Sequence, residues 1–134
     1  MKPLRIPGDP ARAVKDHLAT TVPPLLTGID PTFGLSLPGD WTPKSTAHVG
    51  VFDDTGPAVW PVATRPLLRV TVWSSGRTRS REIAGLCLGI LLAQQVPGVA
   101  SVRDPSSILD ARDSHNDGVM ASFAVRVTAR THAL

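Results

Sequence analysis

The chain has 134 residues, of which 42% are hydrophobic and 19% are charged, a composition typical of a single globular domain with its own core. Its longest stretch without a strongly polar residue, Ile83 to Ala93, is 11 residues long, whereas a membrane-spanning helix needs about 20. We therefore expect no membrane span. The single cysteine, Cys87, excludes an internal disulfide, and the proline-broken segment after Met1 lacks the apolar region of a secretory signal.

The net charge is +3, from 14 basic and 11 acidic residues, and the basic excess lies in one half of the chain. Residues 1–66 carry six residues of each sign, whereas residues 67–134 carry eight basic and five acidic residues. A charge of this sign and size suits weak contact with an anionic surface.

Prolines divide the chain into two parts. Eleven of the 13 prolines lie in residues 1–66, and each one removes a backbone donor and restricts the residue before it. We therefore expect the first part to contain one helix and only short strands, each isolated or at a sheet edge. Asp9 and Pro10 are residue types preferred at a helix start, and the predicted helix continues to about Thr20. Its apolar stripe consists of Val14, Leu18 and Val22.

The rest of the first part offers weaker patterns. Pro23 and Pro24 end the first helix, and residues 28–40 are predicted to form a loop. Two short strands, 47–52 and 58–64, are predicted on either side of a turn at residues 53–56.

The second part begins with a clear alternation over residues 67–73. One face of this predicted strand carries Leu68, Val70 and Val72, and the other carries Arg69, Thr71 and Trp73. A helix capped by Thr78 or Ser80 is predicted to follow and to run to about Gln95.

Two further strands are predicted, a return strand over residues 99–103 and a last strand over residues 119–128, separated by a loop over residues 105–118. Together the elements predict one α+β domain, residues 1–134, in which helices pack on one face of a mixed or antiparallel sheet. Residues 1–66 contribute a helix, loops and short strands, and residues 67–134 contribute a strand, helix, strand, loop and strand.

The helix predicted in the second part has almost no polar face. Its sheet-covering stripe consists of Ile83, Leu86, Cys87, Ile90 and Leu91. Leu88 and Leu92 fall on roughly the opposite side, and Gly85, Gly89 and Ala93 form a ridge of small residues. Such a helix needs a second cover, either the proline-rich part of the chain or a neighbouring subunit. Leu88 and Leu92 are therefore candidate interface residues.

Sequence motifs for nucleotide binding, metal binding or catalysis are scarce. Neither GxxxxGK[ST] nor GxGxxG occurs, so nothing indicates a nucleotide-binding loop. The four histidines are scattered and one thiol cannot form a sulfur-rich metal site, so we expect no metal ion and no cofactor. Cys87 lies on the apolar stripe and is interpreted as a buried core residue.

Residues 110–118 are the segment that most resembles a metal-binding or catalytic motif. Numbered from Asp113 they resemble the first half of a calcium loop, but His115 stands at the third position and Ala124 at the twelfth, where a glutamate is required. Asp110, Asp113 and His115 could also form an acid–base set. The simpler interpretation is a solvated loop in which Asp-Gly at 117–118 turns the chain into the last strand.

The tryptophans are candidate interface residues. Trp41 and Trp60 lie in proline-rich segments, and Trp73 lies on the polar face of its strand. A tryptophan exposed on the isolated chain is typical of a surface that a partner covers. The alternative is that these rings pack beneath long loops of the same chain.

Three arginines at the start of the second helix are candidates for anion contact. Arg77, Arg79 and Arg81 stand where positive charge is unfavourable unless it meets an anion. DNA phosphate or an acidic partner would supply that anion, whereas a solvated basic turn is the alternative.

Taken in order, five elements of the chain resemble the tail terminator proteins of long-tailed, non-contractile (siphovirus-type) bacteriophages. They are the opening helix at 9–14, the strand ending in Val72-Trp73-Ser74, the helix rich in small residues over 81–95, the turn at 97–99, and the closing strand over 122–127, which follows an acidic Asp-Gly loop. The resemblance covers about two thirds of the chain and leaves residues 28–66 unmatched.

The resemblance implies a structural virion protein and not an enzyme. Members of the family look like α+β subunits that form a six-membered ring, end the growth of the tail tube and offer a docking surface to head completion or neck proteins. It therefore implies a homo-oligomer, with the tail tube protein and a head completion protein as partners. It also implies transient DNA passage through the lumen, and a place at the head-proximal end of the virion tail after assembly in the host cytoplasm.

Other functions stay open from the sequence. One is a different head–tail connector or neck subunit of the same kind of virion, and another is a small cellular interaction module. An enzyme that uses the segment from Asp110 to Asp117 is a third.

Overall fold

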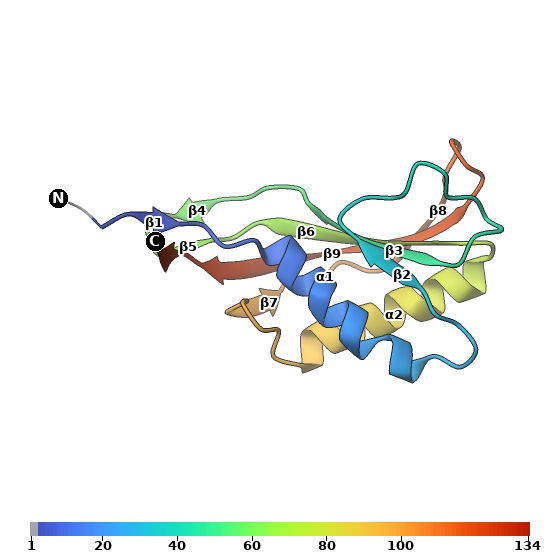
Figure 1. The fold of residues 1–134 in the computed structure, drawn as a ribbon, viewed down its shortest axis with the longest axis horizontal. Helices are drawn as coiled ribbons and strands as arrows, with labels where there is room; N and C mark the ends of the chain where they lie inside the picture. Colours follow the sequence, from blue (N-terminus) through green and yellow to red (C-terminus); the bar gives the residue numbers. More distant parts are fainter. Residues whose placement is uncertain (1–2) are drawn as a thin grey trace.

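The computed structural model describes residues 3–134 and has an α+β architecture. Two α-helices lie on the same side of a mixed sheet, and both ends of the described chain lie at one end of the molecule (Figure 1). The predicted fold class is confirmed. The expectation about a secretory signal extends to Met1 and Lys2, which lie outside the described residues.

The helices are α1 (Pro10–Thr21), the 3-10 helix η1 (Pro23–Leu25) and α2 (Arg77–Ala93). The strands of the first part are β1 (Arg5–Ile6), β2 (Thr32–Gly34), β3 (His48–Asp53), β4 (Ala58–Val59) and β5 (Ala63–Thr64). The strands of the second part are β6 (Leu67–Ser74), β7 (Ser101–Arg103), β8 (Leu109–Arg112), β9 (Val119–Arg130) and β10 (His132–Ala133).

The 12-residue strand β9 organises the main sheet. β6 pairs with it antiparallel, from Ser74 opposite Val119 to Leu67 opposite Arg126. β7 and β8 pair with the opposite edge of β9. Arg126, for example, therefore has one partner on β6 and another on β7. Beyond β6 the sheet continues with β3 and then with β2, which is parallel to β3. The two predicted alternating strands are therefore confirmed, and the structure shows that they are direct neighbours.

β3 contradicts the expectation that strands before residue 66 are isolated or at an edge. It pairs with β2 on one edge and with β6 on the other, and its residues 48–51 are buried. The segment between Pro43 and Pro57 contains no proline, so every residue of β3 keeps its backbone donor. The proline-rich part thus supplies an internal strand.

The hydrophobic core lies between the helices and the sheet. α2 packs on β6 and β9, while α1 packs on β2 and β3. The predicted stripe of α1 is confirmed, because its three residues are fully buried. The sheet contributes its own buried side chains to the same core, namely Val49, Val51, Leu68, Val70, Val72, Ala121, Phe123, Val125 and Val127. Each fully buried large apolar side chain contributes about 1.5–3 kcal/mol of hydrophobic stabilisation.

The start of α1 is confirmed and the start of α2 is corrected. A carboxylate oxygen of Asp9 accepts a hydrogen bond from the Arg12 N–H (3.2 Å), which caps α1. α2 begins directly after Gly76 without a side-chain cap, so a cap at Thr78 or Ser80 is wrong. The Ser80 hydroxyl instead donates to the Val119 carbonyl oxygen (2.8 Å) and ties α2 to β9.

Several short strands lie where the sequence predicts none. β2 and β8 fall in segments predicted as loops, 28–40 and 105–118. Residues 58–64, predicted as one strand, form the two strands β4 and β5, and β1 pairs with β10 in a ribbon that was not predicted. Strands of two to four residues are too short to display a period, and their pairing partners define them.

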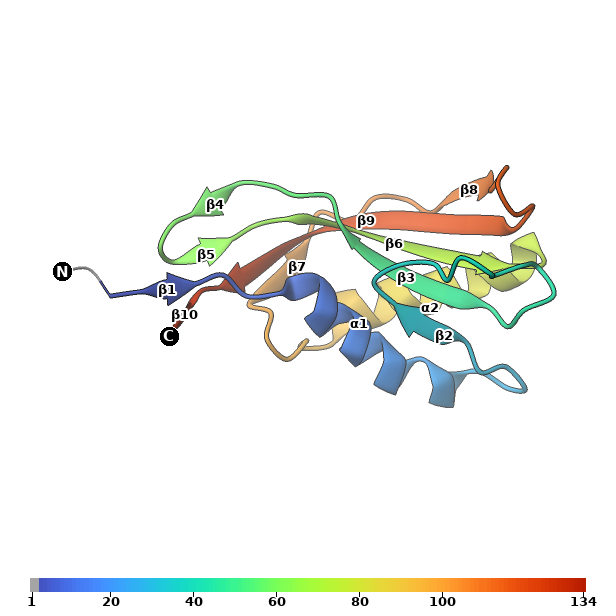
Figure 2. The same cartoon turned by 45° about the horizontal axis from the view of Figure 1, so that its top comes forward.

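At one end the sheet narrows into an extension, here called the arm, formed by β1, β4, β5 and β10 (Figures 1 and 2). Hydrogen bonds hold its parts together. Arg5 Nη2 donates to the Thr131 carbonyl oxygen (2.8 Å), and the Thr131 N–H donates to the Val62 carbonyl oxygen (3.0 Å). These bonds hold Arg5 and Thr131 beside the β4–β5 hairpin.

At the other end, the segment between β2 and β3 crosses the sheet face opposite the helices (Figure 2). Trp41 from this segment and Trp73 from β6 are buried, each 6% exposed. The Trp73 ring meets the Phe52 ring edge-on, with 6.0 Å between their centroids. Gly118 lies so close to Trp41 that an added Cβ would stand 2.6 Å from the indole ring. Both tryptophans thus pack outside the main core, within contacts that the chain itself supplies.

Gly118→Ala is expected to lower the free energy of unfolding by about 1–3 kcal/mol, because its methyl group would overlap the Trp41 ring. Urea denaturation measures the change. Gly39→Ala is the control, since an added Cβ there has no atom within 4 Å, and it should unfold like the wild type. Equal midpoints for the two variants would contradict this packing.

Candidate interaction surfaces

The three candidate tryptophans have different surroundings. Trp41 Nε1 donates to the Thr46 carbonyl oxygen (2.9 Å), and Trp73 Nε1 donates to Asp113 Oδ2 (3.0 Å). Both rings are buried within the chain. The interpretation of packing beneath a loop is therefore correct for Trp41 and Trp73, and the interpretation of an exposed interface residue is wrong for them. Trp60 lies between β4 and β5 and is 56% exposed.

The arm carries an uncharged apolar surface, here called the arm surface. Its large hydrophobic side chains are between 46% and 83% exposed, namely Leu4, Val59, Trp60, Val62 and Leu134. Residues 57–64 contain no charged side chain. Several large exposed apolar side chains at one end of a molecule are typical of protein–protein contact sites.

A second uncharged surface, here called the outer face of α2, lies on the side of the helix turned away from the sheet. Leu92 is 48% exposed, and a Cβ added at Gly85 or Gly89 would have no atom within 4 Å. Ala93 is exposed as well. Within residues 3–134, therefore, the proline-rich part does not cover this face of the helix.

Leu88 does not share this exposure. It is half-buried and packs against the core, so its expected position on the free side of α2 is wrong. The buried arc of the helix includes Ala84 and leaves Leu86 half-buried, which rotates the arc toward Leu88. Leu92 is the better probe of the outer face, because a polar residue at position 88 would also disturb folding.

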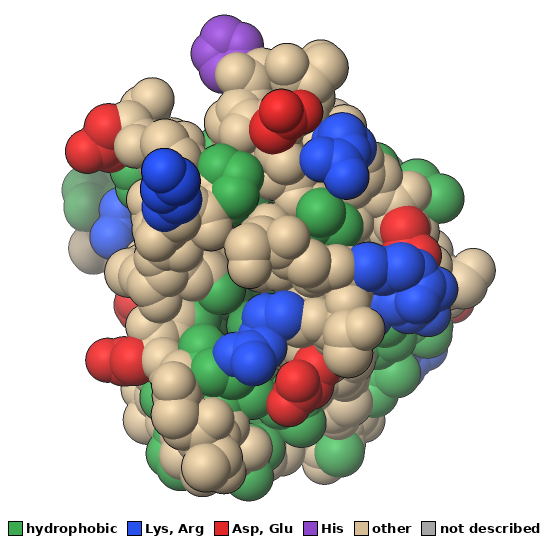
Figure 3. Space-filling model, turned by 90° about the vertical axis from the view of Figure 1, so that its right-hand side faces the viewer, with side chains coloured by type: hydrophobic (Ala, Val, Ile, Leu, Met, Phe, Trp, Pro, Cys, Tyr) green, Lys and Arg blue, Asp and Glu red, His purple; other side chains and the backbone are tan. Residues whose placement is uncertain are grey.

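The three candidate arginines of α2 have acidic partners within the chain. Arg77 Nε lies 2.7 Å from Asp110 Oδ2, and Arg81 Nη1 lies 2.8 Å from Asp110 Oδ1. Arg79 lies 3.9 Å from Glu82. The hydrogen bond from Arg81 has the largest effect on Asp110, and together with the bond from Arg77 it holds the pKa of Asp110 below its usual range. Figure 3 shows this end of the molecule, where basic and acidic side chains alternate.

An open depression of about 600 Å³ lies beside these arginines at the start of α2. Asp30 and Glu82 line it together with Arg77 and Arg79, so the charges around it balance. Neither the depression nor the helix start therefore offers a free anion site.

The segment predicted as a solvated turn forms the β8–β9 connection. Asp113 accepts hydrogen bonds from the His115 N–H (2.9 Å) and from Trp73 Nε1, and these bonds hold its pKa below the usual range. Asp117 turns the chain with a φ of 64°. Asp110 and Asp113 thus have separate structural partners, and the His115 side chain is exposed. Within residues 3–134, no group of three or more His, Cys, Asp or Glu side chains could hold a metal ion.

Cys87 is buried in the core, as predicted. Burial raises the pKa of its thiol to about 12, which keeps the sulfur protonated and unreactive at neutral pH.

No helix in the described part of the chain is long and apolar enough to cross a membrane.

A basic group that sequence analysis did not single out lies on β7, β9 and the β5–β6 connection, namely Arg103, Arg126 and Arg65. The one signal for Arg103 and Arg126 was the basic excess after residue 66, and Arg65 had none. No protein-family model matches this chain, and no curated protein matches its sequence.

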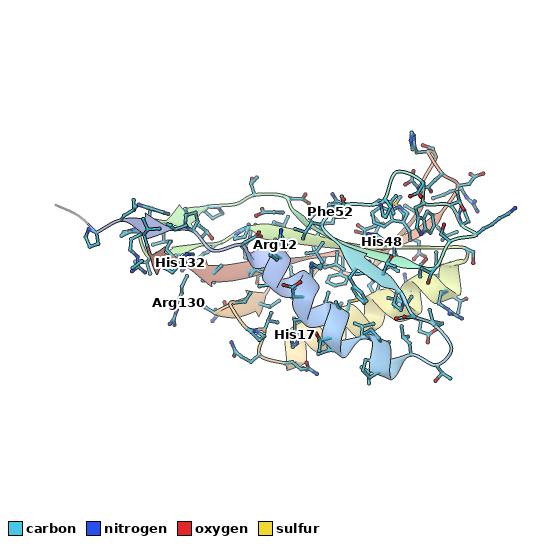
Figure 4. All side chains as sticks on the ribbon, in the orientation of Figure 1. Arg12, His17, His48, Phe52, Arg130 and His132 are labelled. Carbon is cyan, nitrogen blue, oxygen red and sulfur yellow. The ribbon has the colours of Figure 1, made fainter. Side chains whose placement is uncertain are left out.

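His48 links β3 to the segment that crosses the sheet (Figure 4). Its Nε2 donates to the Ser36 carbonyl oxygen (2.8 Å), and in the neutral imidazole its Nδ1 accepts from the Thr32 hydroxyl (2.7 Å). Burial lowers the pKa of His48 from its usual value of 6.5, and the bond to Ser36 opposes that shift in part.

Stability is expected to depend on the protonation of His48. Because its pKa is lower in the folded chain than in the unfolded chain, its contribution is complete above pH 6.5 and is lost as the pH falls through the folded-state pKa. His48→Gln keeps a donor for Ser36 but cannot titrate, so its free energy of unfolding should vary less between pH 7 and pH 5. Urea denaturation across this range measures the difference.

His132→Gln, an exposed position on β10 (Figure 4), is the control and should keep the wild-type pH profile. Identical profiles for the wild type and His48→Gln would contradict the role of His48.

Proposed function

We propose that this chain is a structural virion protein, a tail terminator subunit of a siphovirus-type bacteriophage that assembles into a ring, and not an enzyme. The observation that carries the proposal is the exposure of two separate uncharged surfaces on one protomer, the arm surface and the outer face of α2. The α+β fold and the order of its elements add support from the resemblance in sequence.

A closed ring needs a heterologous contact, in which one patch of each subunit meets a different patch of the next. The arm projects from the sheet (Figure 2), whereas the outer face of α2 is open at Gly85 and Gly89, where an added Cβ would have no atom within 4 Å. In the proposed contact, Trp60 and Val62 of one protomer pack beside Leu92 of the next. Trp60, Val62 and Leu92 are uncharged, so burying these three side chains removes no ion from water.

The ring has two rims with different partners. One rim mates with the tail tube protein, and the other receives a head completion or neck protein. Growth of the tube stops because the terminator matches the tube on one face and presents a different face on the other. In this proposal DNA passes through the lumen, and the protein is located at the head-proximal end of the tail after assembly in the host cytoplasm.

Trp60→Ser and Leu92→Asp are each expected to weaken ring assembly at least about tenfold, or about 1.4 kcal/mol, because each removes or charges an apolar contact. Light scattering over a dilution series measures assembly. Both side chains are exposed, so unfolding midpoints should stay close to wild type.

Leu109→Asp is the matched control, since Leu109 is 69% exposed on β8, outside both surfaces. It should assemble like the wild type. Equal loss of assembly in the control would contradict the placement of the contact.

Cross-linking tests which surfaces meet. Val62→Cys and Leu92→Cys protomers are mixed and oxidised, and the buried Cys87 thiol, with its raised pKa, does not compete. We expect disulfide dimers that contain one protomer of each kind. Dimers formed only within one variant would contradict a contact between the arm and α2.

A further inference from the structure

Ion pairing among the arginines is uneven. Six of the 11 arginines lie within 4.0 Å of an acidic side chain, namely Arg12, Arg69, Arg77, Arg79, Arg81 and Arg112. Among residues 3–134, the arginines with neither an acidic partner nor a bond to Thr131 are Arg65, Arg103, Arg126 and Arg130. All four lie on β7, on β9 or just after β5. Uncompensated positive charge is therefore concentrated in one region of the sheet.

Three of these arginines line a single open depression of about 380 Å³, namely Arg65, Arg103 and Arg126. Arg103 stands directly opposite Arg126 across the β7–β9 pair, so both side chains lie on the same face of the sheet. Val125 and Val127 face the core, so this is the face turned away from the helices.

The arrangement of these groups favours a bound anion. Arg126 Nη1 donates to the Arg65 carbonyl oxygen (3.1 Å), which fixes the guanidinium at the edge of the depression. Like charges directly opposite each other in a sheet repel, and an anion between Arg103 and Arg126 would relieve that repulsion. Three arginines against the one carboxylate of Asp104 leave the lining with a net charge of +2.

We propose that this depression binds phosphate groups of a nucleic-acid backbone. Guanidinium groups match phosphate oxygens with two parallel hydrogen bonds, and the hydroxyls of Ser101 and Thr128 add neutral donors. Its lining contains no apolar or aromatic side chain, so it offers no anchor for a protein partner and no surface on which a base could stack. Contact is therefore to the backbone and independent of base sequence.

The proposal does not depend on the ring, because every residue of the depression belongs to one protomer. It also differs from the sequence-based candidates Arg77, Arg79 and Arg81, whose acidic partners are already in place.

Fluorescence anisotropy with a labelled DNA duplex of about 20 base pairs tests the proposal at several salt concentrations. We expect the full chain to bind, with an affinity that falls steeply with salt and differs less than about twofold between duplex sequences. Arg103→Gln combined with Arg126→Gln should weaken binding at least about tenfold. It should also reduce the slope of log affinity against log salt by about 1.8, or about 0.9 for each lost phosphate contact.

Arg12→Gln combined with Arg79→Gln is the matched control, because it removes the same charge from arginines that have acidic partners. Its affinity should stay within about twofold of wild type. Replacing Arg103 and Arg126 by lysine should restore most of the salt dependence. The Arg103→Gln unfolding midpoint should equal or exceed the wild-type value, which separates lost binding from lost folding.

Three results would overturn the proposal. They are absence of duplex binding at about 50 mM salt, equal loss of binding in the matched control, and tighter binding of polyglutamate than of the duplex, which would assign the depression to an acidic protein. The Leu92→Asp protomer should retain duplex binding, so failure of the ring and failure of this site are distinguishable.

Discussion

Pairing of β9 along both of its edges is the constraint on which the rest of the structure depends. Its register with β6 forms the floor on which α2 packs. Its other edge carries β8, which brings Asp110 to the arginines of α2, and β7, which sets Arg103 opposite Arg126. Its last residues hold β5 and so position the arm. Each proposed surface is therefore placed by contacts that β9 makes.

The elements that sequence predicted well are those with a long, self-contained pattern. α1, β6 and β9 each bury an uninterrupted stripe, and the periodicity of that stripe appears in the sequence itself. β2, β8 and the β1–β10 ribbon have two to four residues and exist because a distant partner pairs with them. Proline content misled the interpretation of β3, because the average over residues 1–66 hides the proline-free window that forms this strand.

The same distinction applies to the candidate surfaces. The lack of a polar face on α2 predicted an apolar outer surface, and Leu92 is exposed there, but the orientation of Leu88 depended on how the helix rolls against the sheet. Sequence placed Arg77 and Arg81 beside a helix start and could not place Asp110, about 30 residues later, between them. The arm and the Arg103–Arg126 pair likewise follow from sheet register, which composition does not specify.

A protomer that exposes two separate apolar surfaces is proposed to associate with copies of itself, and the solution mass of the wild-type chain tests this proposal most directly. Sedimentation equilibrium over a wide range of concentrations should give a fixed multiple of 14.2 kDa, sixfold for the ring that the sequence resemblance implies. The mass should not grow further, because a closed ring has no free ends. A mass of 14.2 kDa that persists to millimolar concentration would contradict self-assembly as the basis of this protein's function.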